Sequence, residues 1–516
     1  MTLISDEANA SPGKPPLPPV WLLVTVQAAV SAASLVVEIV AGRMLAPWLG
    51  MSLYTWTSII AVVLAGFSAG HWVGGRFAAR PGPRALALTA WSLAGAAVTT
   101  GLAVFLLRWF AAPMIAALGH PVAAIVALTT TAFFLPSFFA GIPAPVLAHV
   151  AVTAQPGRSG QALGAMFAAG ALGAIAGTLA AGFLFISWLG STATLAVIAV
   201  TYAALAGLLL AFAARARARD RVLLAALLLA SLLPAASALA LPDPCLRESH
   251  YFCIRVEDIS ADAGEPARLM VLDHLAHGAT ARNNPARMIT PHAALLEALP
   301  RARFEGRPFS AFFIGGGSFT IPRAWAAAGV SSRLTVAEID PMVTRTAAEN
   351  FWFDPATARV LDMDARLALA ADTARHDVII GDAFTDIAVP AHLVTREFFT
   401  LVRDRLTPDG IYVMNIVDHI GRLRALSAIT RTLREVFPVV EVWAETVRPE
   451  PDARVTFIVL AGSEPTDVNR ITSTPPEAYE FGRLSAPIID AMIQRTGAPV
   501  LTDDFAPIDR LMGRLD

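Results

Sequence analysis

The stretch AFFIGGG, residues 311–317, joins a run of bulky apolar residues to three consecutive glycines. An uninterrupted apolar run of this length is typical of a strand buried on both faces of a parallel sheet. Glycines directly after such a strand let the backbone turn sharply and approach a bound nucleoside closely. This stretch therefore predicts the first strand and the first ligand-binding turn of an α/β nucleotide-binding domain.

The residues that follow continue the alternation of strand and helix. Further strands are expected at 333–339, 360–363, 377–381, 410–416, 438–445 and 454–461, with helices between most of them. Such alternation predicts an α/β, Rossmann-like domain with a largely parallel sheet, which we assign to residues 306–516. Alternating apolar residues at 250–258 and 268–273 predict a small β region before it, at residues 243–305.

Acidic residues stand where the second and third predicted strands end. Glu338 lies 21 residues after Gly317, and Asp364 and Ala365 follow the third strand. Ligands of an open parallel sheet bind at the carboxyl ends of its strands, and a carboxylate at the spacing of Glu338 can bind both ribose hydroxyls. The full GxGxxG pattern of dinucleotide-binding turns is missing, which disfavours NAD and favours a nucleoside of the S-adenosylmethionine type.

The first half of the chain has a very different composition. The protein is 55% hydrophobic and only 16% charged, whereas ordinary soluble domains are about a quarter charged, so a soluble single-domain enzyme is excluded. About 20 apolar residues cross a bilayer. Runs of that length occupy residues 20–46, 53–75, 85–107, 121–150, 161–189, 191–213 and 222–242. We therefore expect a multi-pass transmembrane domain of about seven helices at residues 20–242, after a disordered tail at residues 1–19.

Residues 109–119 are apolar but too short to span, and we expect a re-entrant or interfacial segment there. Arginines cluster after the second predicted span, at 76, 80 and 84, and after the sixth, at 215–221. The positive-inside rule places these loops and the N-terminus in the cytoplasm, so seven spans put the C-terminal domain outside it. Cys245 and Cys253, the only cysteines, suit either a disulfide in an oxidising compartment or two buried thiols. The expected location is the cell (inner) membrane. The loop charges and the two cysteines favour an extracytoplasmic C-terminal domain, and a cytoplasmic one stays open as the alternative.

The charge of the C-terminal half limits its partners. Residues 222–516 carry 37 acids against 28 bases, and Lys14 is the only lysine of the chain. An acidic surface argues against nucleic acid as a partner and suits a cationic ligand. The lysine count also excludes a P-loop lysine or a Schiff-base lysine from the folded part of the chain.

Several motifs resemble those of the spermidine synthase (polyamine aminopropyltransferase) family, a branch of the Rossmann-like methyltransferase fold. They are FIGGG at 313–317, VAEID at 336–340, DAR at 364–366, DVIIGDAF at 377–384 and TREFF at 395–399. The resemblance extends over residues 248–460. The N-terminal spans, with Glu38, Arg43 and residues 52–75, resemble the family members that are fused to a membrane domain.

This resemblance implies that an aminopropyl group moves from decarboxylated S-adenosylmethionine to a diamine such as putrescine. It places the nucleoside on Gly315, Gly316, Gly317, Glu338, Asp364 and Ala365. Asp382, at the end of the fourth strand, is then the catalytic base that takes the proton of the amine; a carboxylate that only caps the next helix is the alternative. The expected partners are the diamine and the lipid bilayer, with a homodimer possible and no metal.

The predicted amine site departs from the family pattern. His277 stands where the family has a glutamine, Ser318 where it has an aspartate, and Pro291 before His292 where it has a tyrosine. His277, His292 and Asp386 are the predicted amine-binding residues, although Asp386 is one residue further from Asp382 than is usual. Asp503 and Asp504 are candidate substitute carboxylates, or else belong to a turn or helix cap. Another S-adenosylmethionine-dependent transferase, such as a methyltransferase, and a non-catalytic polyamine-binding or transport protein stay open as alternatives.

Overall fold

The computed structural model describes residues 18–213, 218–383, 389–450 and 453–512. These residues form two compact units, and the chain passes from the first to the second after Asp243. Most of the predicted N-terminal tail, residues 1–17, lies outside the described residues, and the first helix begins at Val20.

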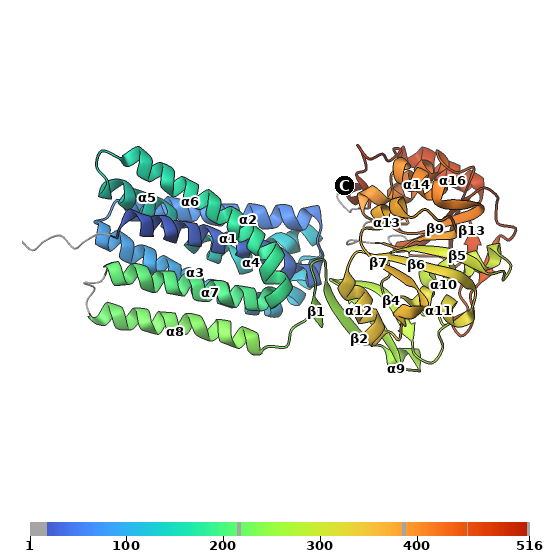
Figure 1. Cartoon of the computed structure of the whole chain (residues 1–516), viewed down its shortest axis with the longest axis horizontal. Helices are drawn as coiled ribbons and strands as arrows, with labels where there is room; N and C mark the ends of the chain where they lie inside the picture. Colours follow the sequence, from blue (N-terminus) through green and yellow to red (C-terminus); the bar gives the residue numbers. More distant parts are fainter. Residues whose placement is uncertain (1–17, 214–217, 384–388, 451–452, 513–516) are drawn as a thin grey trace, which may run out of the picture. The chain divides into compact units, whose positions relative to one another are not determined.

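The first unit is built from helices (Figure 1). They are α1 (Val20–Leu49), α2 (Leu53–Ala78), α3 (Gly82–Leu118), α4 (Pro121–Gly141), α5 (Pro143–Ala154), α6 (Ser159–Ala180), a π-helical turn η1 (Ala181–Phe185), α7 (Ile186–Ala213) and α8 (Ala218–Ala240). Within the described residues, five helical stretches are long and apolar enough to cross a membrane: α1, α2, α3, Pro121–Ala154 and Ser159–Ala213.

The breaks between these helices differ in part from the sequence-based expectation. α3 runs on through Pro113 to Leu118, so the prediction of a separate re-entrant or interfacial segment at 109–119 is wrong. The run 121–150 breaks at Ile142, directly before Pro143, because proline cannot donate the backbone hydrogen bond that a continuous helix needs. The 55-residue run Ser159–Ala213 breaks at Gly190. Its positive φ of 76° is a backbone conformation that glycine adopts readily because it has no Cβ.

Glycines let several of these helices approach closely. A Cβ atom added at Gly173 of α6 would lie 2.1 Å from the carbonyl oxygen of Ala28 on α1. One turn further, a Cβ at Gly177 would lie 2.2 Å from the carbonyl oxygen of Ala32. Small residues four apart allow this backbone-to-backbone packing, which supplies much of the attraction between helices in lipid.

We expect Gly173→Ala to lower the thermal stability of the purified protein in detergent, because the new methyl group forces α6 away from α1. Overpacking of this kind typically costs about 1–3 kcal/mol. Gly164→Ala is the matched control on the same helix, since a Cβ there meets nothing within 4 Å and alanine favours a helix by up to about 1 kcal/mol. Equal melting temperatures for the two variants would contradict the close approach of α1 and α6.

The second unit is built on a nine-stranded sheet within the described residues. Its spatial order is β12-β13-β10-β11-β9-β8-β5-β6-β7. The strands are β5 (Phe309–Ile314), β6 (Ser331–Glu338), β7 (Arg359–Asp362), β8 (His376–Gly381), β9 (Leu406–His419), β10 (Val439–Glu445), β11 (Arg454–Gly462), β12 (Arg470–Thr472) and β13 (Glu480–Arg483). β5 to β9 are parallel and lie in the order 3-2-1-4-5, while β11 and β10 add antiparallel strands beyond β9. This is a doubly wound, Rossmann-like sheet, as the sequence predicts.

Helices connect these strands and complete the unit. They are α11 (Thr320–Ala328), α12 (Pro341–Asn350), α13 (Ala365–Ala371), α14 (Arg396–Arg405), α15 (Arg424–Arg434), α16 (Ala486–Thr496), α17 (Ile508–Met512), and the 3-10 turns η2 (Pro355–Thr357) and η3 (Ala391–Leu393). Apolar layers cover both faces of the sheet, so neighbouring residues of β5 lie in different layers: Phe312 packs in one and Phe313 in the other. The unbroken apolar run of β5 is explained by this burial on both sides.

A smaller antiparallel sheet precedes the large one. It holds β1 (Arg247–Glu248), β2 (Cys253–Asp258), β3 (Ala267–Leu272) and β4 (Leu275–Ala281), with the short helix α9 (Ser260–Ala263) between β2 and β3. Residues 243–305 also contain the helix α10 (Pro291–Arg303), which the sequence analysis did not predict within this small β region. A disulfide joins Cys245 to Cys253 and fixes the start of this sheet.

Candidate active site

A cavity of about 500 Å³ lies in the second unit, where β5, β6 and β8 end. Its wall combines residues from the ends of these strands with residues from β4, α10 and the segment before β2. The titratable and polar residues that line it are Tyr251, His277, His292, Glu338, Asp364, Asp382, His392, Asn415, Arg454 and Thr456. The predicted Gly315, Gly317 and Ala365 line it as well.

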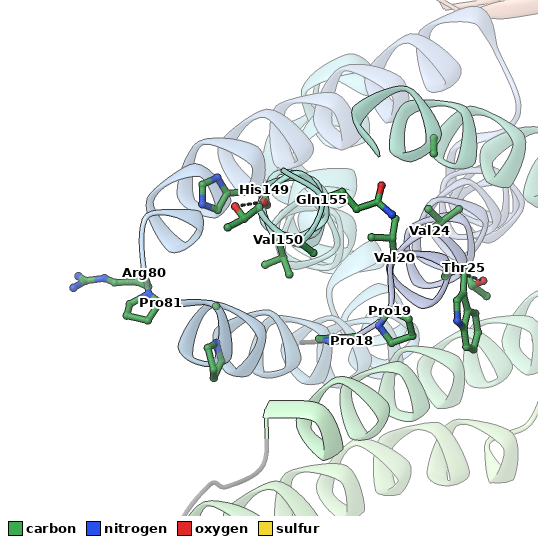
Figure 2. A pocket seen from close by; sticks show the side chains of 16 residues that line it. Pro18, Pro19, Val20, Val24, Thr25, Arg80, Pro81, His149, Val150 and Gln155 are labelled. Carbon is green, nitrogen blue, oxygen red and sulfur yellow. Dashed lines mark hydrogen bonds between the residues drawn. The ribbon is translucent and has the colours of Figure 1, made fainter. Parts of the chain in front are cut away.

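A larger cavity of about 1510 Å³ lies in the helical unit (Figure 2). Prolines, valines and alanines form most of its wall, and Arg80 and His149 are its titratable lining residues in the described part of the chain. None of those lining residues is a carboxylate that could accept a proton from an amine. The cavity in the second unit is therefore the better candidate for the active site.

The glycine turn fits between two other segments of the cavity wall. Gly315 and Gly317 have φ values of 93° and 51°, which favour glycine. A Cβ at Gly315 would lie 2.4 Å from the carbonyl oxygen of Asp382, and one at Gly317 would lie 2.5 Å from that of His277. Gly315 and Gly317 are therefore required by close packing of the turn against the segments of Asp382 and His277, whereas a Cβ at Gly316 would meet the ring of Phe319.

Glu338 ends β6 and holds the same turn. One carboxylate oxygen accepts hydrogen bonds from the backbone N–H groups of Gly316 at 2.8 Å and Gly317 at 3.4 Å. The other oxygen accepts the N–H of Asp340 at 3.0 Å. Burial raises the pKa of Glu338, and the N–H donors oppose that shift. The oxygen that accepts the N–H of Asp340 has a second lone pair, so Glu338 can also accept a hydrogen bond from a ribose hydroxyl.

Asp364 lies at the start of α13 and has two partners. One of its oxygens accepts the N–H of Leu367 at 2.9 Å and caps the helix. Its other oxygen lies 2.8 Å from Nε2 of His392, which comes from η3 and also lines the cavity. Sequence analysis did not identify His392, which lies 28 positions from Asp364 and reaches it only through the fold.

Asp382 follows β8 and lies among neutral polar groups. Its carboxylate accepts a hydrogen bond of 3.0 Å from the side-chain amide of Asn415 on β9. Burial lowers the pKa of His277 to about 4, while the charge of Asp382 opposes this shift. Burial lowers the pKa of His292 as well, again against Asp382. Both imidazoles are therefore uncharged at neutral pH and can accept hydrogen bonds from an incoming amine.

The structure brings only part of the predicted amine site together. Asp503 does not line the cavity: both its oxygens lie 2.7 Å from the guanidinium of Arg366, which lowers the pKa of Asp503 to about 2. Thr395 donates a further hydrogen bond to it, so Asp503 ties the C-terminal segment to α13 and α14. Asp504 is exposed and does not line the cavity either, and Asp386 lies outside the described residues.

Ser318 does not line the cavity. It is buried and shares a hydrogen bond of 2.7 Å with Thr320, and it packs against β4 at Gly278. In contrast, Asn415, Arg454 and Thr456 line the cavity although no sequence motif indicated them. The alternation along β9 and β11 could have indicated a shared face, but not that this face forms a cavity wall.

Comparisons with known proteins agree with this geometry. Residues 311–470 match the spermine/spermidine synthase domain. Over 131 residues, 25% of this chain and 29% of the relative, the chain is 37% identical to a probable polyamine aminopropyl transferase of Bifidobacterium longum. Over 156 residues, 29% of this chain and 27% of the relative, it is 30% identical to an N-terminal histidine N-methyltransferase of Emericella nidulans. The chain thus spans less than a third of the length of each of these relatives.

Among solved structures, a probable spermidine synthase from Corynebacterium glutamicum is similar, with 23% identity and a TM-score of 0.44. The similarity covers 51% of this chain and 97% of that one. Part of the second unit, residues 311–470, is thus similar to a spermine/spermidine synthase domain, which supports a transferase enzyme.

We expect Glu338→Ala to weaken binding of methylthioadenosine at least tenfold, which corresponds to about 1.4 kcal/mol. The variant removes the predicted ribose acceptor and also the carboxylate that holds the N–H groups of the turn. Isothermal titration calorimetry measures the effect, with Glu464→Ala, an exposed acid in a loop away from the cavity, as control. Unchanged affinity of the Glu338 variant for methylthioadenosine would contradict a role of Glu338 in the nucleoside site.

Proposed function

We propose that this protein is a membrane-anchored aminopropyltransferase of the spermidine synthase type. It transfers the alkyl group of a sulfonium nucleoside, decarboxylated S-adenosylmethionine, to an amine. One observation carries the proposal: a single cavity joins the Glu338–glycine turn and Asp364 to Asp382 at the ends of adjacent parallel strands. The family match and the aminopropyl transferase relative support the same reaction class.

In this reaction, different residues of the cavity bind the nucleoside, accept the proton and bind the amine. Glu338 and Asp364 bind the ribose and base, and the glycine turn lets the nucleoside lie close to the backbone. The amine nitrogen attacks the methylene carbon next to sulfur, the C–S bond breaks, and methylthioadenosine leaves as a neutral thioether. An alkylamine is almost wholly protonated at pH 7, so the attack needs a base, and Asp382 accepts that proton. Asn415 orients Asp382, and the uncharged His277 and His292 accept hydrogen bonds from the amine.

Methyl transfer from S-adenosylmethionine is the second candidate function. The observation that favours it is Ser318, which stands where the family has an aspartate, is buried against Thr320 and does not line the cavity. The products distinguish the two reactions, because methyl transfer releases S-adenosylhomocysteine and aminopropyl transfer releases methylthioadenosine.

We expect Asp382→Asn to lower the turnover of methylthioadenosine formation about a hundredfold or more, the usual effect of losing a general base. Asparagine keeps the shape and the contact with Asn415 but cannot accept the proton. Nucleoside affinity should stay within a few-fold of wild type, because Glu338 and Asp364 are unchanged. The assay uses decarboxylated S-adenosylmethionine with putrescine, the diamine that the family resemblance implies, and with other amines.

Asp409→Asn, an exposed aspartate at the start of β9, is the control for this assay. Full turnover of the Asp382 variant would contradict the role of Asp382. If the wild-type protein releases S-adenosylhomocysteine from S-adenosylmethionine, and no methylthioadenosine with any amine, the result would favour methyl transfer over aminopropyl transfer.

The helical unit supplies the membrane anchor in this proposal. Besides its long apolar helices, it exposes large apolar side chains that water would disfavour: Phe167 is 72% exposed, Phe183 70% and Trp188 82%. Counting the two parts of Ser159–Ala213 separately and adding α8 gives the seven crossings expected from the sequence. With the N-terminus in the cytoplasm, seven crossings place the second unit outside it, and the disulfide between Cys245 and Cys253 suits that compartment. Donor and acceptor must then be present on that side of the membrane.

A reporter fused to the C-terminus tests this orientation. We expect alkaline phosphatase fused there to be active in a bacterial host, because the enzyme folds only outside the cytoplasm. The same reporter inserted after Arg80, in the loop assigned to the cytoplasm, should be inactive. A fluorescent protein at the C-terminus that matures in the cytoplasm would reverse the assignment.

A further inference from the structure

The segment between the two cysteines forms part of the cavity wall in the second unit. We call residues 245–253 the disulfide loop, because the bond between Cys245 and Cys253 closes it. Its strand β1 pairs with β2 over two residue pairs, and Tyr251 and Phe252, between these strands, line the cavity. Both cysteines are buried. The disulfide thus closes a short loop that supplies two aromatic side chains to the cavity wall.

Ser249 holds the disulfide loop from within. Its Oγ accepts the backbone N–H groups of Tyr251 at 3.0 Å and of Phe252 at 2.8 Å. The hydroxyl of Ser249 donates to the carboxylate of Asp340, which is 1% exposed. A buried carboxylate is costly without hydrogen-bond donors, so this contact stabilises Asp340 and fixes the position of the loop at the same time.

Asp340 connects the disulfide loop to the predicted nucleoside site. Its backbone N–H donates to Glu338 at 3.0 Å, and the same carboxylate holds the glycine turn through Gly316 at 2.8 Å. The side chain of Asp340 also accepts the N–H of Met342 at 3.0 Å and caps α12. Ile339, between the two acids, lines the cavity. A displacement of Asp340 would therefore move a donor on which the buried Glu338 depends.

The disulfide is covalent, whereas the other contacts of the loop are not. Arg247 of β1 forms an ion pair of 2.5 Å with Glu349 of α12, but both side chains are partly exposed, and such pairs contribute little. A ladder of two residue pairs and single hydrogen bonds can open locally, while the disulfide limits how far the two ends of the loop separate. Without this bond, Ser249 is less restrained against Asp340.

We propose that the disulfide between Cys245 and Cys253 positions Ser249 against Asp340, and through them Glu338, so that the nucleoside site binds tightly only in the oxidised protein. This inference rests on the proposed function and concerns its donor-binding half. A thiol or phosphine reductant supplies the two electrons that convert the disulfide into two thiols, and the reductant is itself oxidised. Disulfides persist outside the cytoplasm, which is where the proposed orientation places the second unit.

Nucleoside affinity in the two redox states tests the inference. The full-length protein is purified without reductant, and mass spectrometry after alkylation shows the state of both cysteines. Calorimetry with methylthioadenosine is expected to give an affinity at least tenfold lower after reduction, with recovery after reoxidation. The double variant Cys245→Ala, Cys253→Ala should bind like the reduced protein and no longer respond to the reductant. Near-ultraviolet circular dichroism checks that each sample remains folded.

Ser249→Ala tests the contact with Asp340 while the disulfide stays intact. We expect about tenfold weaker binding of methylthioadenosine and a similar rise in KM for the donor, with kcat and the KM for the amine within a few-fold of wild type. A purely structural defect would lower the active fraction, and hence kcat, without changing KM. Ser463→Ala is the matched control, because this exposed hydroxyl donates to the carbonyl of Pro408 and does not line the cavity.

Binding distinguishes failure of this inference from failure of the proposed function. If the protein binds methylthioadenosine in a redox-dependent way but releases none with any amine, the proposed transfer is wrong and the inference stands. Equal affinity of the oxidised and reduced protein, or unchanged affinity of Ser249→Ala, would overturn the inference. It would also be overturned by free thiols at both cysteines of the purified protein, or by an oxidised protein that binds neither methylthioadenosine nor S-adenosylhomocysteine.

Discussion

The carboxylate of Glu338 is the group on which the nucleotide half of the cavity depends. It is buried, and burial of a carboxylate is costly unless hydrogen-bond donors surround it. The N–H groups of Gly316, Gly317 and Asp340 provide those donors, so the same contacts that stabilise the charge also fix the turn after β5. This turn also packs against the backbone carbonyl groups of Asp382 and His277, where only glycine leaves enough room. The predicted nucleoside site and the predicted amine site are thus connected through one glycine turn.

Among the described residues, the predicted amine end of the cavity offers mainly uncharged hydrogen-bonding groups. Burial keeps its histidines uncharged, and the predicted carboxylate Asp503 binds Arg366 instead of lining the cavity. Hydrogen-bond acceptors are present for one amine beside Asp382. The nucleoside half of the cavity therefore suits the proposed alkyl transfer, and the uncharged acceptors of the other half suit an amine.

The helical unit obeys a separate set of constraints. Its helices approach through glycines that touch the neighbouring backbone, as Gly173 and Gly177 do, and its large apolar side chains remain on the outside. Both features are expected where lipid replaces water, because the hydrophobic effect then no longer drives helices together and close contact must. The catalytic chemistry needs none of these features, so the composition of the two halves of the chain differs sharply at residue 243.

Local patterns in the sequence determined the strands of the parallel sheet, the glycine turn and the acids at or just after the ends of β6 and β7, because buried parallel strands and their ligand-binding ends have characteristic periodicities and residue types. They also determined the apolar helices, although not that α3 continues through Pro113. Only the tertiary structure decided which side chains meet across the sheet. Asp503 reaches Arg366 over 137 residues, His392 reaches Asp364, and Asn415 reaches Asp382. Such pairs depend on how strands and loops pack in three dimensions, and a single sequence shows which faces are apolar but not which polar groups share a cavity.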